Sequence, residues 1–357
     1  MTDTTSTGGT REEDLWDSVL PARSKVTPVD RRAARTGGMP LELEELPYEL
    51  EDRPEPPPVP NGWYAIAASS DLGPGEVLST VAAARELVVY RAEGGTVGVL
   101  DAHCPHLGGH LGGGEVHGET VACPYHGWEF ASSGACVEIP YSDGRIPARA
   151  CVRSYPVHEV NDMVLFWYHA GGADPNYEVP RIGEPDDPGF GDVVVHRGEF
   201  TASLQDMAEN NVDYTHFHFV HRREALDAST SRFSTDGPFS TVVETFEEED
   251  LTFTRWTYGP GIALLRVPGL MTVLSATTPI DRRHVRLLWH FHLPVGLEAA
   301  AEEIVDGVVG PFGLGADQPI WRDKVFRDRP VLVRGDGPVA EFRRWYEQFY
   351  EGHPGRG

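Results

Sequence analysis

The chain has 357 residues, 40% of them hydrophobic, and a formal charge of −25 from 55 acidic and 30 basic residues. This length allows two domains, and the acidic excess argues against nucleic acid and anionic membrane surfaces as partners, because both require clustered lysine and arginine. The chain has no apolar run long enough for a membrane span and no apolar core in Met1–Thr10, so we expect neither a span nor a secretory signal, and a cytoplasmic location.

Residues 1–58 are polar, acidic and rich in proline. The stretch Glu51-Asp-Arg-Pro-Glu-Pro-Pro-Pro-Val-Pro60 is predicted to be extended, because proline fixes φ and removes a backbone donor. We therefore expect an N-terminal arm that is partly disordered or drapes over a neighbour.

Residues 59–170 are predicted to form an all-β domain, because short β-rich runs alternate there with turn signals. Gly94-Gly95 is typical of a hairpin turn between two of these runs. The predicted strands are Trp63–Ala67, Leu87–Ala92, Val97–Leu100 and Met163–Tyr168.

Two Cys–His pairs stand in this domain, as Cys104-Pro-His106 and Cys123-Pro-Tyr-His126. A Rieske [2Fe–2S] cluster needs two thiolates on one iron and two imidazoles on the other. Two short loops, each with one cysteine and one histidine, meet that need. The sequence therefore predicts these four residues as the ligands of a Rieske cluster.

A structural zinc ion is the alternative, because a Cys₂His₂ set also suits zinc. Zinc loops usually carry C-x₂-C or H-x₃-H pairs, so the spacing here favours the cluster. The two remaining cysteines, Cys136 and Cys151, have no histidine at ligand spacing, and we expect both to be small buried side chains.

Residues 171–357 are predicted to form a second domain of mixed α and β structure. Its first residues, Gly171–Gly191, are rich in glycine, proline and aspartate and are expected to be the linker between the domains. Ser203-Leu-Gln-Asp206 resembles a capping box and predicts a helix start. A last helix is expected from Pro338. The predicted strands are Thr241–Glu247, Thr252–Tyr258, Met271–Thr277 and His284–Leu293.

The segment from Glu209 to His221 carries a second group of candidate ligands, with Asp213 three residues before His216 and His221 five residues after it. Two histidines and one carboxylate are the usual ligands of an oxygen-activating Fe(II) site. A five-residue spacing rotates a side chain by about 140° on a regular helix, so the helix must bulge or end between the histidines. Asp213 is expected on the same helix face as His216, where it could accept an imidazole N–H.

Three motifs in the second domain carry a family resemblance: Asn210 ahead of Asp213-Tyr-Thr-His216, then Ala316-Asp317-Gln-Pro-Ile-Trp321, then Arg334-Gly-Asp-Gly-Pro338. Together with the Cys–His pairs they resemble the oxygenase (alpha) component of Rieske non-haem iron oxygenases, over nearly all of Gly62–Tyr350. The branch of 3-ketosteroid 9α-hydroxylases and cholesterol 7-desaturases is the most similar. This resemblance implies an α+β protein, with an all-β Rieske domain followed by an α+β catalytic domain that has a twisted antiparallel sheet and flanking helices.

The resemblance also implies the iron site. It places the third ligand of a mononuclear Fe(II), beside His216 and His221, at Asp317, which spacing alone could not choose over Asp306 or Asp323. Two further residues match positions of the family's catalytic machinery: Asp213 matches an aspartate that bridges the two metal sites, and Asn210 matches a residue near the iron. The family implies a homotrimer in which the cluster of one subunit lies beside the iron of its neighbour.

The implied activity is that of a terminal oxygenase in a multicomponent system. Electrons from NAD(P)H would arrive through a ferredoxin, a ferredoxin reductase or both, and O₂ would be used to hydroxylate or desaturate a hydrophobic polycyclic substrate, with steroids among the candidates. One alternative is a tailoring oxygenase that oxidises carbon or nitrogen in a non-steroid natural product. A Rieske-only electron carrier is a further alternative, but the length of the second domain argues against it.

A hydrophobic substrate needs an apolar cavity. Candidate lining residues in the region of the predicted strands are Ile262, Leu264, Val267, Leu270, Met271, Val273, Leu274 and Trp289. His290 and His292 share one strand face with Leu288. We favour both histidines as core residues with satisfied ring nitrogens over residues that contact substrate.

Overall fold

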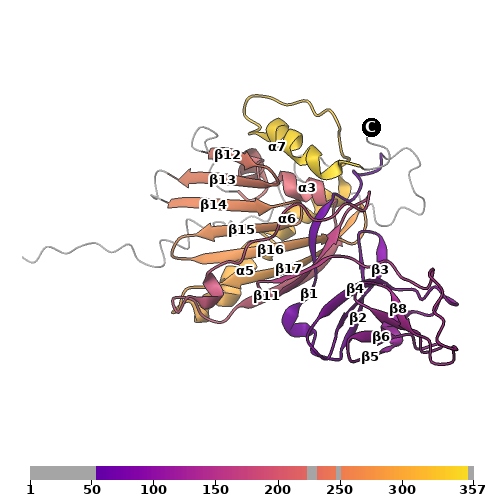
Figure 1. The fold of residues 1–357 in the computed structure, drawn as a ribbon. Helices are drawn as coiled ribbons and strands as arrows, with labels where there is room; N and C mark the ends of the chain where they lie inside the picture. Colours follow the sequence, from indigo (N-terminus) through magenta and orange to yellow (C-terminus); the bar gives the residue numbers. More distant parts are fainter. Residues whose placement is uncertain (1–53, 223–230, 247–250, 353–357) are drawn as a thin grey trace, which may run out of the picture.

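The computed structural model describes residues 54–222, 231–246 and 251–352. Nearly all of the predicted arm at 1–58 lies outside these ranges, as does Glu247 at the end of one predicted strand. Figure 1 shows a smaller β-rich part built from the first half of the described chain, packed beside a large sheet with helices. The division of the chain at residues 170 and 171 stays a prediction.

The N-terminal part consists of three small antiparallel sheets, with orders β1-β10-β9, β2-β3-β4 and β5-β6-β7-β8. All four strands predicted there are present, and the turn at Gly94-Gly95 joins β3 to β4 with Gly95 at φ +96°. The strands are β1 Gly62–Ala68, β2 Val77–Ala82, β3 Arg85–Arg91, β4 Val97–Asp101, β5 Glu115–His117, β6 Thr120–Ala122, β7 Glu129–Ala131, β8 Cys136–Glu138, β9 Val157–Val160 and β10 Met163–Tyr168.

The C-terminal part is built on one seven-stranded antiparallel sheet of order β11-β17-β16-β15-β14-β13-β12. Its four predicted strands are present with small shifts at their ends, whereas β11, β12 and β15 were not predicted from the sequence. The strands are β11 Val194–Thr201, β12 Ser231–Asp236, β13 Phe239–Phe246, β14 Leu251–Tyr258, β15 Ile262–Val267, β16 Met271–Pro279 and β17 His284–His292.

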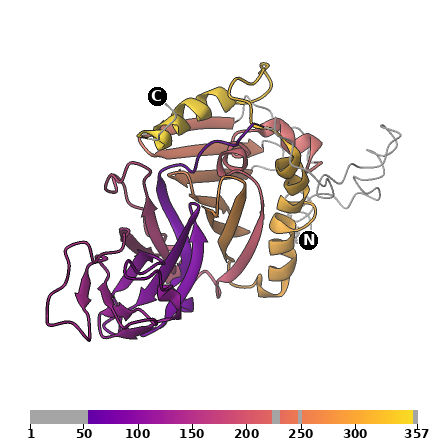
Figure 2. The same cartoon turned by 90° about the vertical axis from the view of Figure 1, so that its right-hand side faces the viewer.

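The two helices within residues 301–323 lie on the side of the large sheet turned away from the β-rich part, whereas the helix at residues 339–346 lies at the end of the sheet next to β12 (Figures 1 and 2). Ser203 caps the first helix of the second part, as predicted, by accepting a hydrogen bond from the Asp206 backbone N–H. The helices are α3 Leu204–Glu209, α4 Tyr214–Phe219, α5 Ala301–Val309, α6 Leu314–Asp323 and α7 Val339–Tyr346. Short 3₁₀ turns occur at η2 Ser69–Asp71, η3 Leu111–Gly113, η4 Glu184–Asp186, η5 Glu298–Ala300 and η6 Glu347–Tyr350.

Both faces of the large sheet are covered. On one face, Leu264, Leu274 and Ala276 pack against Trp63 and Leu165 of the β-rich part. The opposite face lies under the helices. Because each strand exposes alternate residues to opposite faces, the sheet separates a structural interface from the layer that holds the candidate site.

The connecting segment predicted as a loop at Gly171–Gly191 contains only the short turn η4. It is nonetheless fastened to the sheet, because the buried Glu184 carboxylate lies 2.5 Å from Nε of Arg266 and accepts a hydrogen bond from Thr272 at 3.1 Å. These bonds fix the path of the chain between the two parts.

Candidate metal centres and cavity

The two loops that carry the Cys–His pairs have the same backbone geometry. In the first, the Cys104 N–H donates to the Gly109 carbonyl at 2.8 Å, and Gly108 N–H donates back to the Cys104 carbonyl at 3.0 Å. In the second, the Cys123 N–H donates to the Trp128 carbonyl at 2.8 Å, and the Gly127 N–H donates back to the Cys123 carbonyl at 2.9 Å. Gly108 and Gly127 have φ values of +76° and +72°, a conformation that glycine adopts without strain.

The four predicted cluster ligands meet at the tips of these loops. Cys104 and Cys123 are each 3% exposed, and the rings of His106 and His126 lie 4.6 Å apart. Within the described residues, the Nδ1 atom of His106 is buried and has no hydrogen-bond partner. A buried nitrogen without a partner is costly in a folded protein, and a metal bond would satisfy it. The loop geometry therefore fits a metal cluster.

The spread of the four side chains separates a cluster from a single zinc ion. Four ligands bonded to one zinc ion would lie within about 4 Å of one another. In the described part of the chain, these residues form no group of three or more whose ligand atoms all lie within 4.8 Å. Burial raises the pKa of the Cys104 thiol to about 11, so a metal must displace its proton before the sulfur can bind as thiolate.

The other two cysteines differ from each other. Cys136 is buried, as predicted, and its Sγ lies 3.3 Å from the Glu138 carbonyl. Cys151 is exposed, so the prediction of a buried side chain was wrong for it. Cys151 forms an isolated antiparallel bridge with Ala135, outside the named strands.

The segment that carries the second group of candidate ligands is two short helices instead of one. Helix α3 ends at Glu209, and α4 begins after Asp213, whose carboxylate accepts the His216 backbone N–H at 3.1 Å. Asp213 is therefore the N-cap of α4 and not a neighbour of His216 on a helix face. Helix α4 ends at Phe219, before His221. The helix thus ends between the two histidines, one of the two outcomes that their spacing required.

Helix α6 brings a carboxylate to these histidines. The ligand atoms of His216, His221 and Asp317 all lie within 4.8 Å of one another, and Oδ2 of Asp317 is 3.3 Å from Nε2 of His221. The other two candidates lie elsewhere: Asp306 is on α5, and Asp323 pairs with its neighbour Arg322. The geometry therefore favours Asp317 as the third ligand.

Hydrogen bonds hold the three side chains of this group in place. Nδ1 of His221 lies 3.0 Å from the Phe312 carbonyl, and Nδ1 of His216 contacts the Asp213 carbonyl. Each carbonyl accepts an N–H, so each Nε2 is left with a free lone pair, as a metal ligand requires. The Asp213 carboxylate itself lies 4.0 Å from His216 Nδ1, so the backbone of Asp213 and not its side chain sets the tautomer.

Two further effects suit this group to a metal ion. Burial lowers the pKa of His216, which keeps its imidazole neutral. Asn210, the C-cap of α3, donates from Nδ2 to Oδ1 of Asp317 at 3.2 Å. Asn210 thereby orients one carboxylate oxygen and leaves Oδ2 directed to the histidines. The residues present fit a two-histidine, one-carboxylate iron site.

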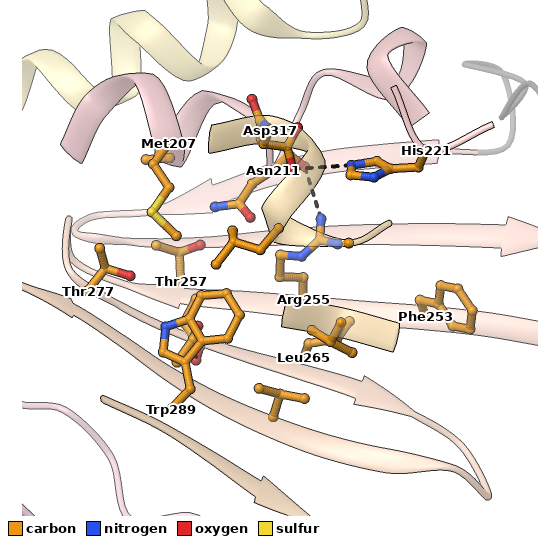
Figure 3. A pocket seen from close by; sticks show the side chains of 18 of the residues that line it. Met207, Asn211, His221, Phe253, Arg255, Thr257, Leu265, Thr277, Trp289 and Asp317 are labelled. Atoms are coloured by element: carbon orange, nitrogen blue, oxygen red, sulfur yellow. Dashed lines mark hydrogen bonds and ion pairs between the residues drawn. The ribbon is translucent and has the colours of Figure 1, made fainter. Parts of the chain in front are cut away.

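The three side chains open into a cavity of about 250 Å³ between the sheet and the helices. Figure 3 shows Asp317 and His221 at one side of it, with Trp289, Thr257 and Leu265 on the strands. Six of the residues predicted to line a cavity do so: Ile262, Val267, Leu270, Met271, Val273 and Trp289. The prediction was wrong for Leu264 and Leu274, which pair with each other and face the β-rich part.

Polar residues in the cavity wall were missed from the sequence. Arg255 on β14 donates to the Asn211 carbonyl at 3.2 Å, and its guanidinium lies 3.7 Å from the buried carboxylate of Glu244. Phe253, Arg255 and Thr257 alternate along β14 and all line the cavity. An arginine in phase with an inward-facing phenylalanine was the signal that could have revealed this group.

Comparison with known proteins agrees with this geometry. Residues 62–156 match the Rieske [2Fe-2S] domain, and residues 166–350 match the 3-ketosteroid 9alpha-hydroxylase C-terminal domain. Cholesterol 7-desaturase nvd 1 from Ciona intestinalis is 31% identical over 331 residues, which cover 83% of this chain and 69% of that protein. The chain belongs to the Rieske non-haem iron oxygenases. A probable 3-ketosteroid-9-alpha-monooxygenase oxygenase component from Rhodococcus rhodochrous is 32% identical over 321 residues, which cover 81% of this chain and 79% of that protein.

Solved structures show the same fold. Dicamba monooxygenase bound to dicamba superimposes with a TM-score of 0.66 at 21% identity, over 81% of this chain and 96% of that one. The expected α+β architecture of this Rieske oxygenase is therefore confirmed. Its Rieske domain implies a [2Fe–2S] cluster, and the family uses mononuclear non-haem iron, which another dicamba monooxygenase structure contains. Within the described ranges, no helix has the length and apolar character needed to cross a membrane.

A second compact group in this Rieske oxygenase, formed by Glu86, His103 and His110, is less suited to a metal. The Gly112 N–H donates to Nδ1 of His110 at 3.1 Å, so the neutral ring carries its proton on Nε2, the atom that faces Glu86. That nitrogen has no lone pair to offer. The Glu86 carboxylate is hydrogen-bonded to His103 at 2.9 Å and lies 3.8 Å from Nε2 of His110, so the group needs no metal ion to hold it together.

His290 and His292 are core residues, 1% and 4% exposed, and neither lines the cavity. Their Nε2 atoms have no hydrogen-bond partner among the described residues, so the expectation of satisfied rings was wrong in that detail. Burial lowers the pKa of both, to about 4 for His292, which keeps the rings neutral at physiological pH. Both rings are thus uncharged at neutral pH, as core residues should be.

Proposed function

We propose that this Rieske oxygenase is the terminal component of a multicomponent system that oxidises a hydrophobic polycyclic substrate, with a steroid as the first candidate. The observation that supports this most is the direct opening of the His216, His221 and Asp317 group into a largely apolar cavity. Relatives named for 3-ketosteroid monooxygenation and cholesterol desaturation support the steroid class.

His216, His221 and Asp317 would hold the iron, which would supply the chemistry of O₂ and C–H oxidation. The protein contributes positioning. Asn210 and the Phe312 carbonyl hold the ligands in one orientation. The apolar wall, including Val273 and Leu265, excludes water and places the substrate beside the metal.

The charge of the cavity favours an uncharged substrate. Arg255 and Glu244 lie 3.7 Å apart with side chains 14% and 3% exposed, so the pair adds no net charge to the cavity wall. A substrate carboxylate or ammonium would have to compete with this buried pair, at a desolvation cost. A neutral molecule with a carbonyl or hydroxyl group avoids that cost and can still hydrogen-bond to Arg255 or Thr257.

Electrons are proposed to arrive from a ferredoxin, a ferredoxin reductase or both. The two histidines of the cluster loops are only half-buried, and Leu107 and Tyr125 beside them are 64% and 62% exposed. A redox centre this close to the surface can accept electrons from a separate protein, which would dock where the neighbouring subunit of the proposed trimer leaves this surface free.

We propose a trimer because the chain carries two exposed apolar patches that lie on different parts of the molecule. Leu107 and Tyr125 lie on the β-rich part, whereas Phe219, which is 71% exposed, ends α4, the helix that carries His216. Val331 and Val333, exposed by 96% and 70%, precede Gly335, whose carbonyl accepts a hydrogen bond from Thr215 of the same helix. Figure 1 shows β5, β6 and β8 at the end of the molecule away from α3 and α6. Two different patches on one chain suit a head-to-tail contact that closes into a ring.

The proposed substrate class can be tested by filling the cavity. Val273→Phe adds an aromatic ring at the centre of the cavity wall, whereas Val295→Phe adds the same ring at a site that is 60% exposed after β17. With a surrogate reductase, we expect the wild type and Val295→Phe to oxidise a 3-ketosteroid or a sterol. Val273→Phe should lower kcat/KM by roughly tenfold or more, since overpacking displaces the substrate.

The same assay includes arylamines and other aromatic metabolites as competing candidates. Product mass distinguishes hydroxylation, desaturation and N-oxidation. Oxidation of a non-steroid alone, still sensitive to Val273→Phe, would replace the steroid proposal by a tailoring oxygenase that uses the same cavity.

A further inference from the structure

The glycine-rich motif Arg334-Gly-Asp-Gly-Pro338 lies against the chain that joins α3 to α4. Thr215 donates from Oγ1 to the Gly335 carbonyl at 2.8 Å. Gly337 has φ +73°, and a Cβ at this position would lie 2.5 Å from the Val212 carbonyl oxygen and 3.2 Å from the Tyr214 ring. Only glycine allows so close an approach, so the motif presses directly on the segment that contains Asp213.

An ion pair fastens the next part of the C-terminal segment to the end of α3. Nη2 of Arg343 donates to Oε2 of Glu209 at 2.9 Å, and Nε lies 2.8 Å from Oε1 of the same carboxylate. Glu209 is buried and also accepts a hydrogen bond from Gln205, whose own amide oxygen accepts the Tyr350 hydroxyl. Glu209 directly precedes Asn210, the residue that holds Asp317.

Aromatic packing completes this contact. Val212 and Tyr214, at 0% and 2% exposure, belong to a buried cluster with residues of α7 and the turn that follows it. The C-terminal members of the cluster are Phe342, Trp345, Tyr346, Phe349 and Tyr350. Ion pair, hydrogen bond and aromatic cluster all converge on one stretch, residues 209–215.

Helices α3 and α4 have only six residues each. Helices this short are not stable by themselves, so tertiary contacts must fix the positions of the side chains they carry. The sheet supports one side of the 209–215 stretch. The segment from Gly335 to Tyr350, here named the C-terminal brace, supports the other.

We infer that the C-terminal brace is a positioning element for the iron site: it fixes the α3–α4 junction, and through it Asn210, Asp213 and His216. This inference rests on the proposed site at His216, His221 and Asp317, and goes beyond it by assigning a role to a segment that contributes no ligand. Outer contacts of this kind at metal sites typically change metal affinity by roughly 10- to 100-fold.

Two alanine substitutions two residues apart test the inference. Gly337→Ala places a Cβ against the Val212 carbonyl, whereas the same change at Gly335 meets nothing within 4 Å and keeps the carbonyl that Thr215 contacts. Each full-length protein, with its Rieske cluster in place, is depleted of mononuclear iron by a chelator. Its Co(II) affinity is then measured by equilibrium dialysis. We expect Gly337→Ala to bind Co(II) roughly tenfold more weakly than wild type, and Gly335→Ala to match wild type.

The melting temperature and the EPR signal of the reduced cluster are measured on the same samples. A purely structural role would lower the melting temperature of Gly337→Ala and leave its Co(II) affinity, measured on folded protein, unchanged. That outcome would overturn the inference while the wild-type site still bound Co(II). A wild type that bound no Co(II) would instead refute the proposed iron site.

A milder pair covers the case in which Gly337→Ala does not fold. Thr215→Val removes only the hydrogen bond to Gly335, and Thr235→Val makes the same change at an exposed position on β12. Weaker Co(II) binding in Thr215→Val than in Thr235→Val supports the brace, and equal binding in the two contradicts it.

Discussion

Replacing Asp317 with alanine should remove the mononuclear iron and all oxygenase activity, while leaving the Rieske cluster intact. Asp317 supplies the only carboxylate of the group whose ligand atoms lie within 4.8 Å of one another, and its neighbours His216 and His221 would be left as a two-nitrogen site. Loss of a direct ligand should weaken iron binding by more than the roughly 10- to 100-fold that outer contacts cost. The two metal sites occupy separate parts of the fold, so the cluster should not respond.

Iron content and EPR of the dithionite-reduced protein measure this result. Asp323→Ala is the matched control, because Asp323 ends the same helix and, within residues 54–222, 231–246 and 251–352, its carboxylate pairs with the adjacent Arg322 and not with the iron ligands. The control should keep both metals and its activity. Full mononuclear iron and turnover in Asp317→Ala would show that another residue binds the metal.

Two inactive variants should restore activity when they are co-expressed. Cys104→Ser lacks the cluster and keeps the iron site, whereas Asp317→Ala keeps the cluster and lacks the iron. If the cluster of one chain serves the iron of its neighbour, random mixing in a closed ring pairs an intact cluster with an intact iron site at about a quarter of the contacts. We therefore expect about a quarter of wild-type activity from the mixed preparation and none from either variant alone.

The co-expressed Cys104→Ser and Asp317→Ala chains also test whether Asp213 bridges the cluster and the iron site. Asn also caps helices well, so Asp213→Asn removes the charge and keeps the cap of α4. Introduced into the iron-bearing Cys104→Ser chain, it should lower the restored activity by roughly tenfold or more. Complete absence of restoration in the parent mixture would place both metals of each working pair in one chain and refute the proposed assembly.

The parts of the site that could be predicted from the sequence are local. Cys104 and His106 lie in one short loop and Cys123 and His126 in another, so their spacing already reflects their geometry. The two histidines of the iron site were also found in this way, because the helix end at Phe219 is a local event that their spacing required.

Asp317 could not be derived from local pattern, because it reaches the site through tertiary packing. It lies 107 residues from Asn210, its hydrogen-bond partner, and only the packing of α6 over the sheet brings the two together. Spacing had left Asp306 and Asp323 as equal candidates. The family resemblance supplied the choice, and the position of α6 supports it.

The cavity wall shows a different limit. Strands β15 and β16 carry apolar side chains on both faces of the sheet, because one face lines the cavity and the other packs on the β-rich part. Alternation therefore could not assign a face, and Leu264 and Leu274 were placed on the wrong one. Arg255 was missed because charged residues mostly lie at the surface, so an arginine in the sequence does not predict a side chain in a cavity wall.

Iron and zinc per chain, measured together with EPR of the dithionite-reduced protein, decide whether both metal centres are present. We expect two cluster irons and one further iron in each chain, no stoichiometric zinc, and the signal of a reduced Rieske centre from Cys104, His106, Cys123 and His126. Two irons without a third would indicate an electron carrier. Stoichiometric zinc with a silent spectrum would show that the two Cys–His loops hold a zinc ion and no Rieske cluster.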